Sequence, residues 1–117
     1  MSRTAKLFKR LDELEEEFRR RAGAQLQRRL RGGFSMFLLR LHPQSTDIRI
    51  HGNDDDNELF WMEKEIIALR AKLQKPMDQS PVGQFHKLCA DIGADQKGGL
   101  GHQFKLIGEL LDCWGIE

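Results

Sequence analysis

Apolar residues recur every three or four positions between residues 58 and 74. The members of this series are Leu59, Met62, Ile66, Leu69 and Leu73. A 3,4 repeat over two heptads is typical of a helix that buries one face. Phe60 and Ile67 lie beside the series and are expected to widen that face. The pattern therefore predicts a central helix over residues 58–75.

The first 31 residues show the same helical spacing. Their apolar positions are Leu7, Leu11, Leu14 and Phe18, continued with some drift by Ala22, Leu26 and Leu30. The spacing predicts one long helix from about Thr4 to Arg31, which the following Gly32-Gly33 pair would cap. A helix of this size is roughly 40 Å long, so we expect one end to project or to meet a second copy.

The period of the pattern changes between residues 34 and 51. Residues 47–51 alternate strictly between polar and apolar, as a half-buried strand does. Residues 34–41 are apolar and short, and they fit either a strand or one face of a helix. Because a lone strand needs a partner, we predict a β-hairpin over 34–51 with its loop at 43–46. The alternative, in which 34–41 is helical, stays open.

Two shorter helices are predicted within residues 81–115. Ser80 and Pro81 have the residue types of an N-cap and a first helical position, and the helix that they open is expected to end near Gly93. A glycine-rich turn then leads into a last helix over 102–114. Trp114 ends the apolar stripe of that helix, and we expect it to close the domain by packing across the preceding helix, near Phe85.

These elements predict a single domain over residues 1–117 with an α+β, mostly helical fold. Its order is a long N-terminal helix, a β-hairpin, a central helix and two shorter C-terminal helices. An all-α bundle is the alternative.

The charge of the chain is balanced overall but uneven along the sequence. Nineteen Lys and Arg against eighteen Asp and Glu give a net charge of +1, which produces no overall attraction to nucleic acid or to an anionic membrane. Residues 1–32 nevertheless carry ten basic and five acidic side chains, whereas residues 76–117 carry three and six. The charge is therefore polarised from one end of the sequence to the other.

Cysteine content and hydropathy place the chain in a broad class. Two cysteines are too few for a disulfide scaffold, and no segment approaches the roughly 20 apolar residues of a membrane span. We therefore predict a cytoplasmic protein that has no membrane association.

The sequence offers weak signals for chemistry. His86 and Cys89 are one helical turn apart, but His102 and Cys113 are separated by about 16 Å along their helix, too far to share one zinc ion. The glycine-rich turn at 98–101 lacks the preceding strand and the GKS/T ending of a P-loop. We predict no catalytic residue, no cofactor and no metal, and enzymatic function is disfavoured.

Arginines carry the nucleic-acid hypothesis. Those at 19–21 follow glutamates at 15–17 by four positions, the favoured orientation for ion pairs, and are expected to be self-paired. Other arginines lack such partners and are candidates for contacts with phosphates. These candidates are Arg28, Arg29 and Arg31 at the end of the first helix and Arg40 and Arg49 on the predicted hairpin.

The leading functional hypothesis is a non-enzymatic interaction or scaffold protein. Two helical seams and a two-sided apolar hairpin present more apolar surface than one short chain is expected to cover. We therefore predict a homo-oligomer or a complex with another protein, with nucleic-acid binding as the alternative. The candidate interface residues are Leu7, Leu11, Leu14, Phe18, Phe34, Met36 and Leu38.

Overall fold

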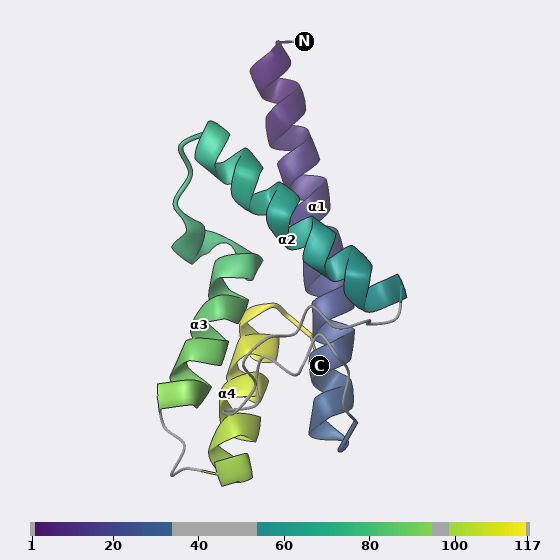
Figure 1. Ribbon diagram of the computed structural model, residues 1–117, viewed down its shortest axis with the longest axis vertical. Helices are drawn as coiled ribbons and strands as arrows, with labels where there is room; N and C mark the ends of the chain where they lie inside the picture. The colour runs from purple at the N-terminus through teal and green to yellow at the C-terminus, as the bar shows by residue number, and fades with distance from the viewer. Residues whose placement is uncertain (1, 34–53, 95–98, 117) are drawn as a thin grey trace.

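A computed structural model describes residues 2–33, 54–94 and 99–116 (Figure 1). These residues form α-helices and one short 3-10 helix. The elements are α1 (Arg3–Leu30), α2 (Asp54–Lys72), the 3-10 helix η2 (Met77–Gln79), α3 (Pro81–Ala94) and α4 (Gly99–Cys113).

The prediction of an α+β fold is wrong: the structure is helical, with no strand among the residues that it describes. The predicted hairpin, residues 34–51, lies outside those residues. The reason for the helical architecture is that the apolar faces of the helices bury one another. The core that they form therefore needs no sheet to cover it.

The four α-helices form two pairs (Figure 1). In one pair α2 crosses α1 obliquely and runs in the opposite direction. Two contacts show this direction: Glu58, near the start of α2, binds Arg21, and Lys75, beyond the end of α2, lies over Phe8. In the other pair α3 and α4 lie side by side. The start of α1 rises beyond the other helices, as the length of the predicted helix indicated.

The core takes side chains from all four α-helices. Its buried members are Leu11, Leu14, Phe18, Ala22 and Leu26 of α1; Leu59 and Ile66 of α2; Val82, Phe85, Leu88 and Ile92 of α3; and Ile107 and Leu111 of α4. Phe18 is at its centre, because its ring meets those of Phe85 and Trp114 edge to face, each at a centroid distance of 6.4 Å.

The predicted seam of α2 faces this core, with one exception at its margin. Leu59 and Ile66 are fully buried, and Phe60 is partly buried against the core. Ile67, however, is 41% exposed and points away from the core. Phe60 therefore widens the buried face as predicted, whereas Ile67 does not, and α2 carries apolar residues on its outer side as well.

The ends of α1 and α2 are closed by the same backbone motif. After α1, the N–H of Gly33 donates to the carbonyl of Arg28 and that of Gly32 donates to Arg29, while Gly32 has the left-handed φ of 90°. This is the Schellman arrangement that the glycine pair predicted. After α2, Gln74 takes the left-handed position at φ 57°. A non-glycine residue pays a steric cost there.

The start of α3 agrees with its predicted cap. The Ser80 hydroxyl accepts a hydrogen bond from the Val82 N–H at 3.3 Å, and Pro81 is the first helical residue. A Cβ at Gly83 would collide with the backbone carbonyl of Met77, so the turn around η2 packs directly on this helix. The start of α2 differs from the prediction: the helix begins at Asp54, one turn before residue 58.

Trp114, just beyond the end of α4, contacts both α1 and α3. Its ring is partly buried and meets Phe18, and its indole Nε1 donates to the Gln84 side chain of α3 at 2.7 Å. The predicted contact with the α3 helix is thus made through a polar residue. The contact between the Trp114 ring and the Phe18 ring of α1 was not predicted from the sequence.

Candidate interaction surfaces

A polar cluster is buried where α1, α2 and the start of α3 meet. The Arg70 guanidinium donates from Nε and Nη2 to the two carboxylate oxygens of Glu15, at 2.7 and 2.8 Å. Its Nη1 donates to the carbonyl of Pro76 at 2.7 Å, and the Ser80 hydroxyl donates to Glu15 at 2.6 Å. Both charged side chains are almost fully excluded from solvent. The cluster therefore ties three elements together.

The chemistry of this cluster is structural. Burial by itself would raise the pKa of Glu15, but the hydrogen bonds from Arg70 and Ser80 and the positive charge of Arg70 outweigh it, so that the pKa lies below its ordinary value. Ser80 is fully buried and donates its proton to a carboxylate that Arg70 already holds. We conclude that neither group is placed to act on a substrate.

The depressed pKa of Glu15 predicts a loss of stability in acid. Because the pKa is lower in the folded chain, the stabilisation is present above the ordinary value of 4.5 and is lost as the pH falls through the folded value. A Glu15→Gln variant cannot titrate at this position. The difference in free energy of unfolding between wild type and variant should therefore shrink between about pH 6 and pH 3. Urea titrations at both pH values measure it, and a constant or growing difference would contradict the assignment.

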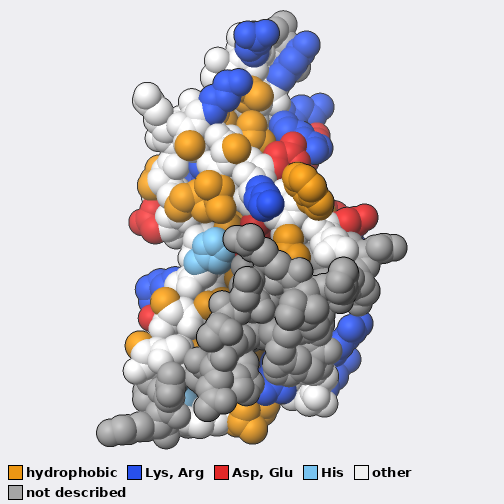
Figure 2. Space-filling view, viewed as in Figure 1, with side chains coloured by type: hydrophobic (Ala, Val, Ile, Leu, Met, Phe, Trp, Pro, Cys, Tyr) orange, Lys and Arg blue, Asp and Glu red, His pale blue; other side chains and the backbone are white. Residues whose placement is uncertain are grey.

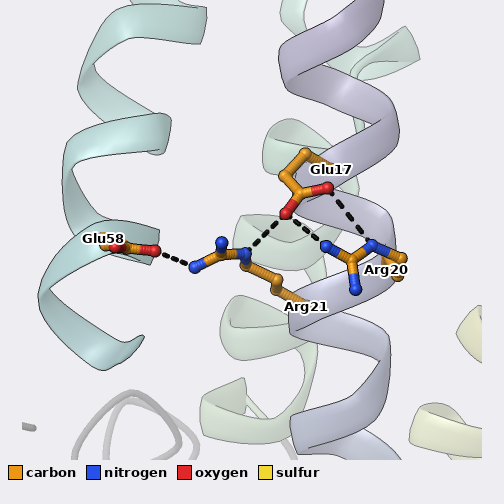
Figure 3. Close-up of polar contacts among 4 residues, drawn as sticks. All are labelled: Glu17, Arg20, Arg21 and Glu58. Carbon is orange, nitrogen blue, oxygen red and sulfur yellow. Dashed lines mark hydrogen bonds and ion pairs between the residues drawn. The ribbon is translucent and has the colours of Figure 1, made fainter. Parts of the chain in front are cut away.

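The arginines at 19–21 are paired with acidic side chains (Figure 3). Arg19 binds Glu16 at 3.0 Å, while Glu17 accepts hydrogen bonds from both Arg20 and Arg21. Arg21 also reaches across to Glu58 of α2. The hydrogen bonds from Arg21 and Arg20 lower the pKa of Glu17 below its ordinary value. The expectation of a self-paired face is confirmed, although the partners differ from the simple four-residue register, since Glu15 is used inside by Arg70.

Of the arginines proposed for phosphate contacts, the structure describes three. Arg29 donates to Gln103 at 3.2 Å and lies over the Phe104 ring at 5.4 Å, so it helps to join α1 to α4. Arg28 and Arg31 are exposed at the end of α1, and neither has a carboxylate partner among the residues described. Arg40 and Arg49 lie outside the described part of the chain.

The candidate interface residues of α1 lie inside the chain's own core. Leu11 and Phe18 are fully buried, Leu14 nearly so, and Leu7 is half-buried. Their seam packs against α2 and the C-terminal helices, so the first three side chains are not on the surface. The remaining candidates, Phe34, Met36 and Leu38, lie outside the described residues.

An apolar stripe along the outer face of α2 was missed by the sequence reasoning. We call it the α2 stripe; its members are Trp61, Ile67, Ala68 and Ala71, all exposed. Trp61 is 70% exposed, with Lys64 Nζ at 5.2 Å from the centre of its ring. Figure 2 shows hydrophobic side chains gathered over α2 on this face. The sequence does carry a signal for this stripe, because Trp61 and Ile67 lie outside the 3,4 series of apolar residues that forms the buried seam of α2.

A second unpredicted surface is a group of cations at the projecting end of α1. We call it the basic tip; its members are Arg3, Lys6, Lys9, Lys72 and Lys75. The contact between Lys75 Nζ and the Phe8 ring, at 5.2 Å, brings the end of α2 to the start of α1. Lys and Arg side chains surround this end in Figure 2. The tip therefore combines segments more than 60 positions apart in sequence.

Hollows in the described surface do not gather catalytic groups. One of about 420 Å³ lies between α1 and the chain's end, and its charged members, Glu16, Arg19 and Arg20, are already in ion pairs. Another of about 230 Å³ lies between α3 and α4 and holds the paired Lys87 and Asp91. Cys113 lines both hollows, and no histidine lines either one among the residues that the structure describes.

Histidine and cysteine have scattered positions. His86 Nε2 lies 2.7 Å from the buried Glu63 carboxylate, and neither Cys89 nor Cys113 is in a disulfide. Within residues 2–33, 54–94 and 99–116, three or more metal-ligating side chains nowhere come together. None of the helices described is both long and apolar enough to cross a membrane.

Comparisons of the chain with protein-family models, with curated proteins and with solved structures gave no match.

Proposed function

We propose that this chain is a non-enzymatic interaction protein that self-associates through the α2 stripe. The observation that carries the proposal is Trp61, a large apolar side chain that is 70% exposed on a helix whose other face is already packed in the core. Tryptophan is enriched among the residues that dominate binding energies at protein interfaces. An exposed apolar stripe of this kind marks a place where another surface is expected to pack.

The sizes of the side chains favour a second copy as the occupant. Trp61 lies near the start of the α2 stripe, while the small residues Ala68 and Ala71 lie near its end, about 10 to 15 Å further along the helix. A two-fold axis across an antiparallel pair of α2 helices would set each Trp61 over the alanines of the other copy. The same patch then serves both subunits, as an isologous interface requires.

The charge along the sequence of α2 favours the same orientation. The helix begins with the sequence Asp-Asp-Asp-Asn-Glu over residues 54–58 and carries the exposed cation Lys72 at its end, while Arg70 is buried against Glu15. An antiparallel arrangement places the acidic beginning of one copy beside the basic end of the other, whereas a parallel one would place like charges together.

Light scattering coupled to size exclusion, over a range of protein concentrations, tests this proposal. Wild type is expected to form a dimer, and Trp61→Ala is expected to weaken it at least tenfold, since truncating an anchor residue at an interface costs about 2 kcal/mol or more. Because Trp61 is mostly exposed, the variant's circular dichroism should match that of wild type.

Leu100→Ala is the matched control, because Leu100 is 58% exposed on α4, away from α2. It should leave dimerisation unchanged. A wild type that stays monomeric at the highest concentration, or a dimer that Trp61→Ala leaves intact, would refute self-association through the α2 stripe.

A further inference from the structure

The ion pairs between α1 and α2 follow a regular series that ends in like charges. Glu58 pairs with Arg21, and Glu65 pairs with Arg10 at 3.1 Å. Both glutamates lie seven residues apart, so they stand on the same side of α2. The next residue at that spacing is Lys72, a cation.

The heptad spacing therefore directs Lys72 toward the first turns of α1. These turns carry Arg3 and Lys6, while α1 has no acidic residue before Asp12. All three cations are exposed, and none has a carboxylate partner among the described residues. Like charges held together in this way raise the local positive potential, and an external anion would relieve their repulsion.

The other members enlarge the basic tip along α1. At 100° per residue, Arg3, Lys6 and Lys9 occupy an arc of about 120° that begins roughly 80° from Leu11, at Arg3, and turns away from the core toward Lys9. Lys75 borders the tip from beyond the end of α2, next to Phe8. Arg10 is the one nearby cation already neutralised, by Glu65.

We propose that the basic tip binds the phosphate backbone of a nucleic acid. The cations from Arg3 to Lys9 span about 9 Å along α1, and a strand of duplex DNA carries one charge per 3.4 Å, so about three phosphates face the tip. Among the described residues in the first turns of α1, the large apolar side chains are Phe8 and the half-buried Leu7, too few for insertion into a bilayer. This proposal does not rest on self-association through the α2 stripe.

Fluorescence anisotropy with a labelled 20-base-pair duplex and a single-stranded RNA of equal length tests the proposal. Wild type is expected to bind at low salt with an affinity that falls steeply as salt rises, with a log–log slope of about −2.7 on the duplex for about three phosphate contacts. Lys6→Glu/Lys9→Glu should weaken binding at least tenfold and reduce the slope by about 2.

Arg28→Glu/Arg31→Glu is the matched control. It makes the same change in net charge at the opposite end of α1, also at exposed positions, and it removes two of the arginines that the sequence favoured. It should change the affinity less than threefold. Every substituted residue is exposed, so both double variants are expected to fold. Circular dichroism checks this.

Four results would overturn the proposal. They are an absence of binding to either probe at low salt, an equal loss of affinity in both double variants, a loss confined to the Arg28/Arg31 variant, and binding of anionic phospholipid vesicles that depends on the tip while the nucleic acids do not bind.

Discussion

Arg70→Ala is expected to lower the free energy of unfolding by about 3 to 5 kcal/mol, the range for removing one partner of a buried ion pair. The Glu15 carboxylate would remain buried with two of its three hydrogen bonds gone, and the Pro76 carbonyl would lose the hydrogen bond from Arg70 as well. Since the cluster joins α1, α2 and the start of α3, the loss should affect the whole domain. Urea denaturation followed by circular dichroism measures the change.

The double variant Glu15→Leu/Arg70→Met is the control. It separates the cost of leaving a buried charge without its partner from the cost of losing side-chain contacts. Replacing a whole buried ion pair by apolar side chains of similar size often costs little, because no charge is left without a partner. We therefore expect the double variant to be more stable than Arg70→Ala. If the two were equally unstable, the ion pair would not be the source of the effect.

Phe18→Ala is expected to cost about 3 to 5 kcal/mol, the usual range for truncating a buried phenylalanine. Its ring is fully buried and contacts aromatic rings from α3 and from the end of α4, so alanine would leave a cavity where three helices meet. Against a total stability of about 5 to 15 kcal/mol, this change brings the domain close to unfolding. The midpoint of urea denaturation measures it.

Phe8→Ala provides the matched comparison, because it removes the same side chain from the same helix at a position that is 37% exposed. It should cost well under half as much. A similar loss for both variants would mean that α1 is not anchored through Phe18, and a shift below about 1 kcal/mol for Phe18→Ala would contradict its central place in the core.

Much of the helical structure could be predicted from short-range patterns. The bounds of α1, observed as Arg3–Leu30, lie within one residue of the prediction, and the glycine pair after it forms the expected cap. Ser80 and Pro81 open α3 as predicted. These features depend on helical spacing and on hydrogen bonds between residues a few positions apart, which a sequence displays directly.

The fold class was not predicted correctly, because a strand is defined by a partner that the sequence does not identify. An apolar alternation of five residues is compatible with a hairpin only if another segment completes it. The observed core is completed by helix-to-helix packing among α1, α2, α3 and α4. The choice between these solutions depends on distant contacts.

The candidate surfaces show the same division. The i,i+4 rule predicted that the arginines at 19–21 would be paired, and the structure agrees, but the rule assigned Glu15 to Arg19 when it is bound by Arg70, 55 positions away. The sequence pattern predicted Leu11 and Phe18 as interface residues, but in the structure α2 and the C-terminal helices cover them. The outward position of Trp61 and the contact of Lys75 with Phe8 of α1 depend on how α2 crosses α1.

The sequence by itself determined where α1 and α3 begin and end, which face of α2 carries the buried seam, and that the chain is basic at its start. These properties follow from local hydrogen bonding and from the 3.6-residue period, which act over one or two turns. Only the tertiary structure decided which apolar residues stay exposed and which cations lack partners. Burial and charge pairing are properties of the space between helices, and that space exists only once segments distant in sequence have packed.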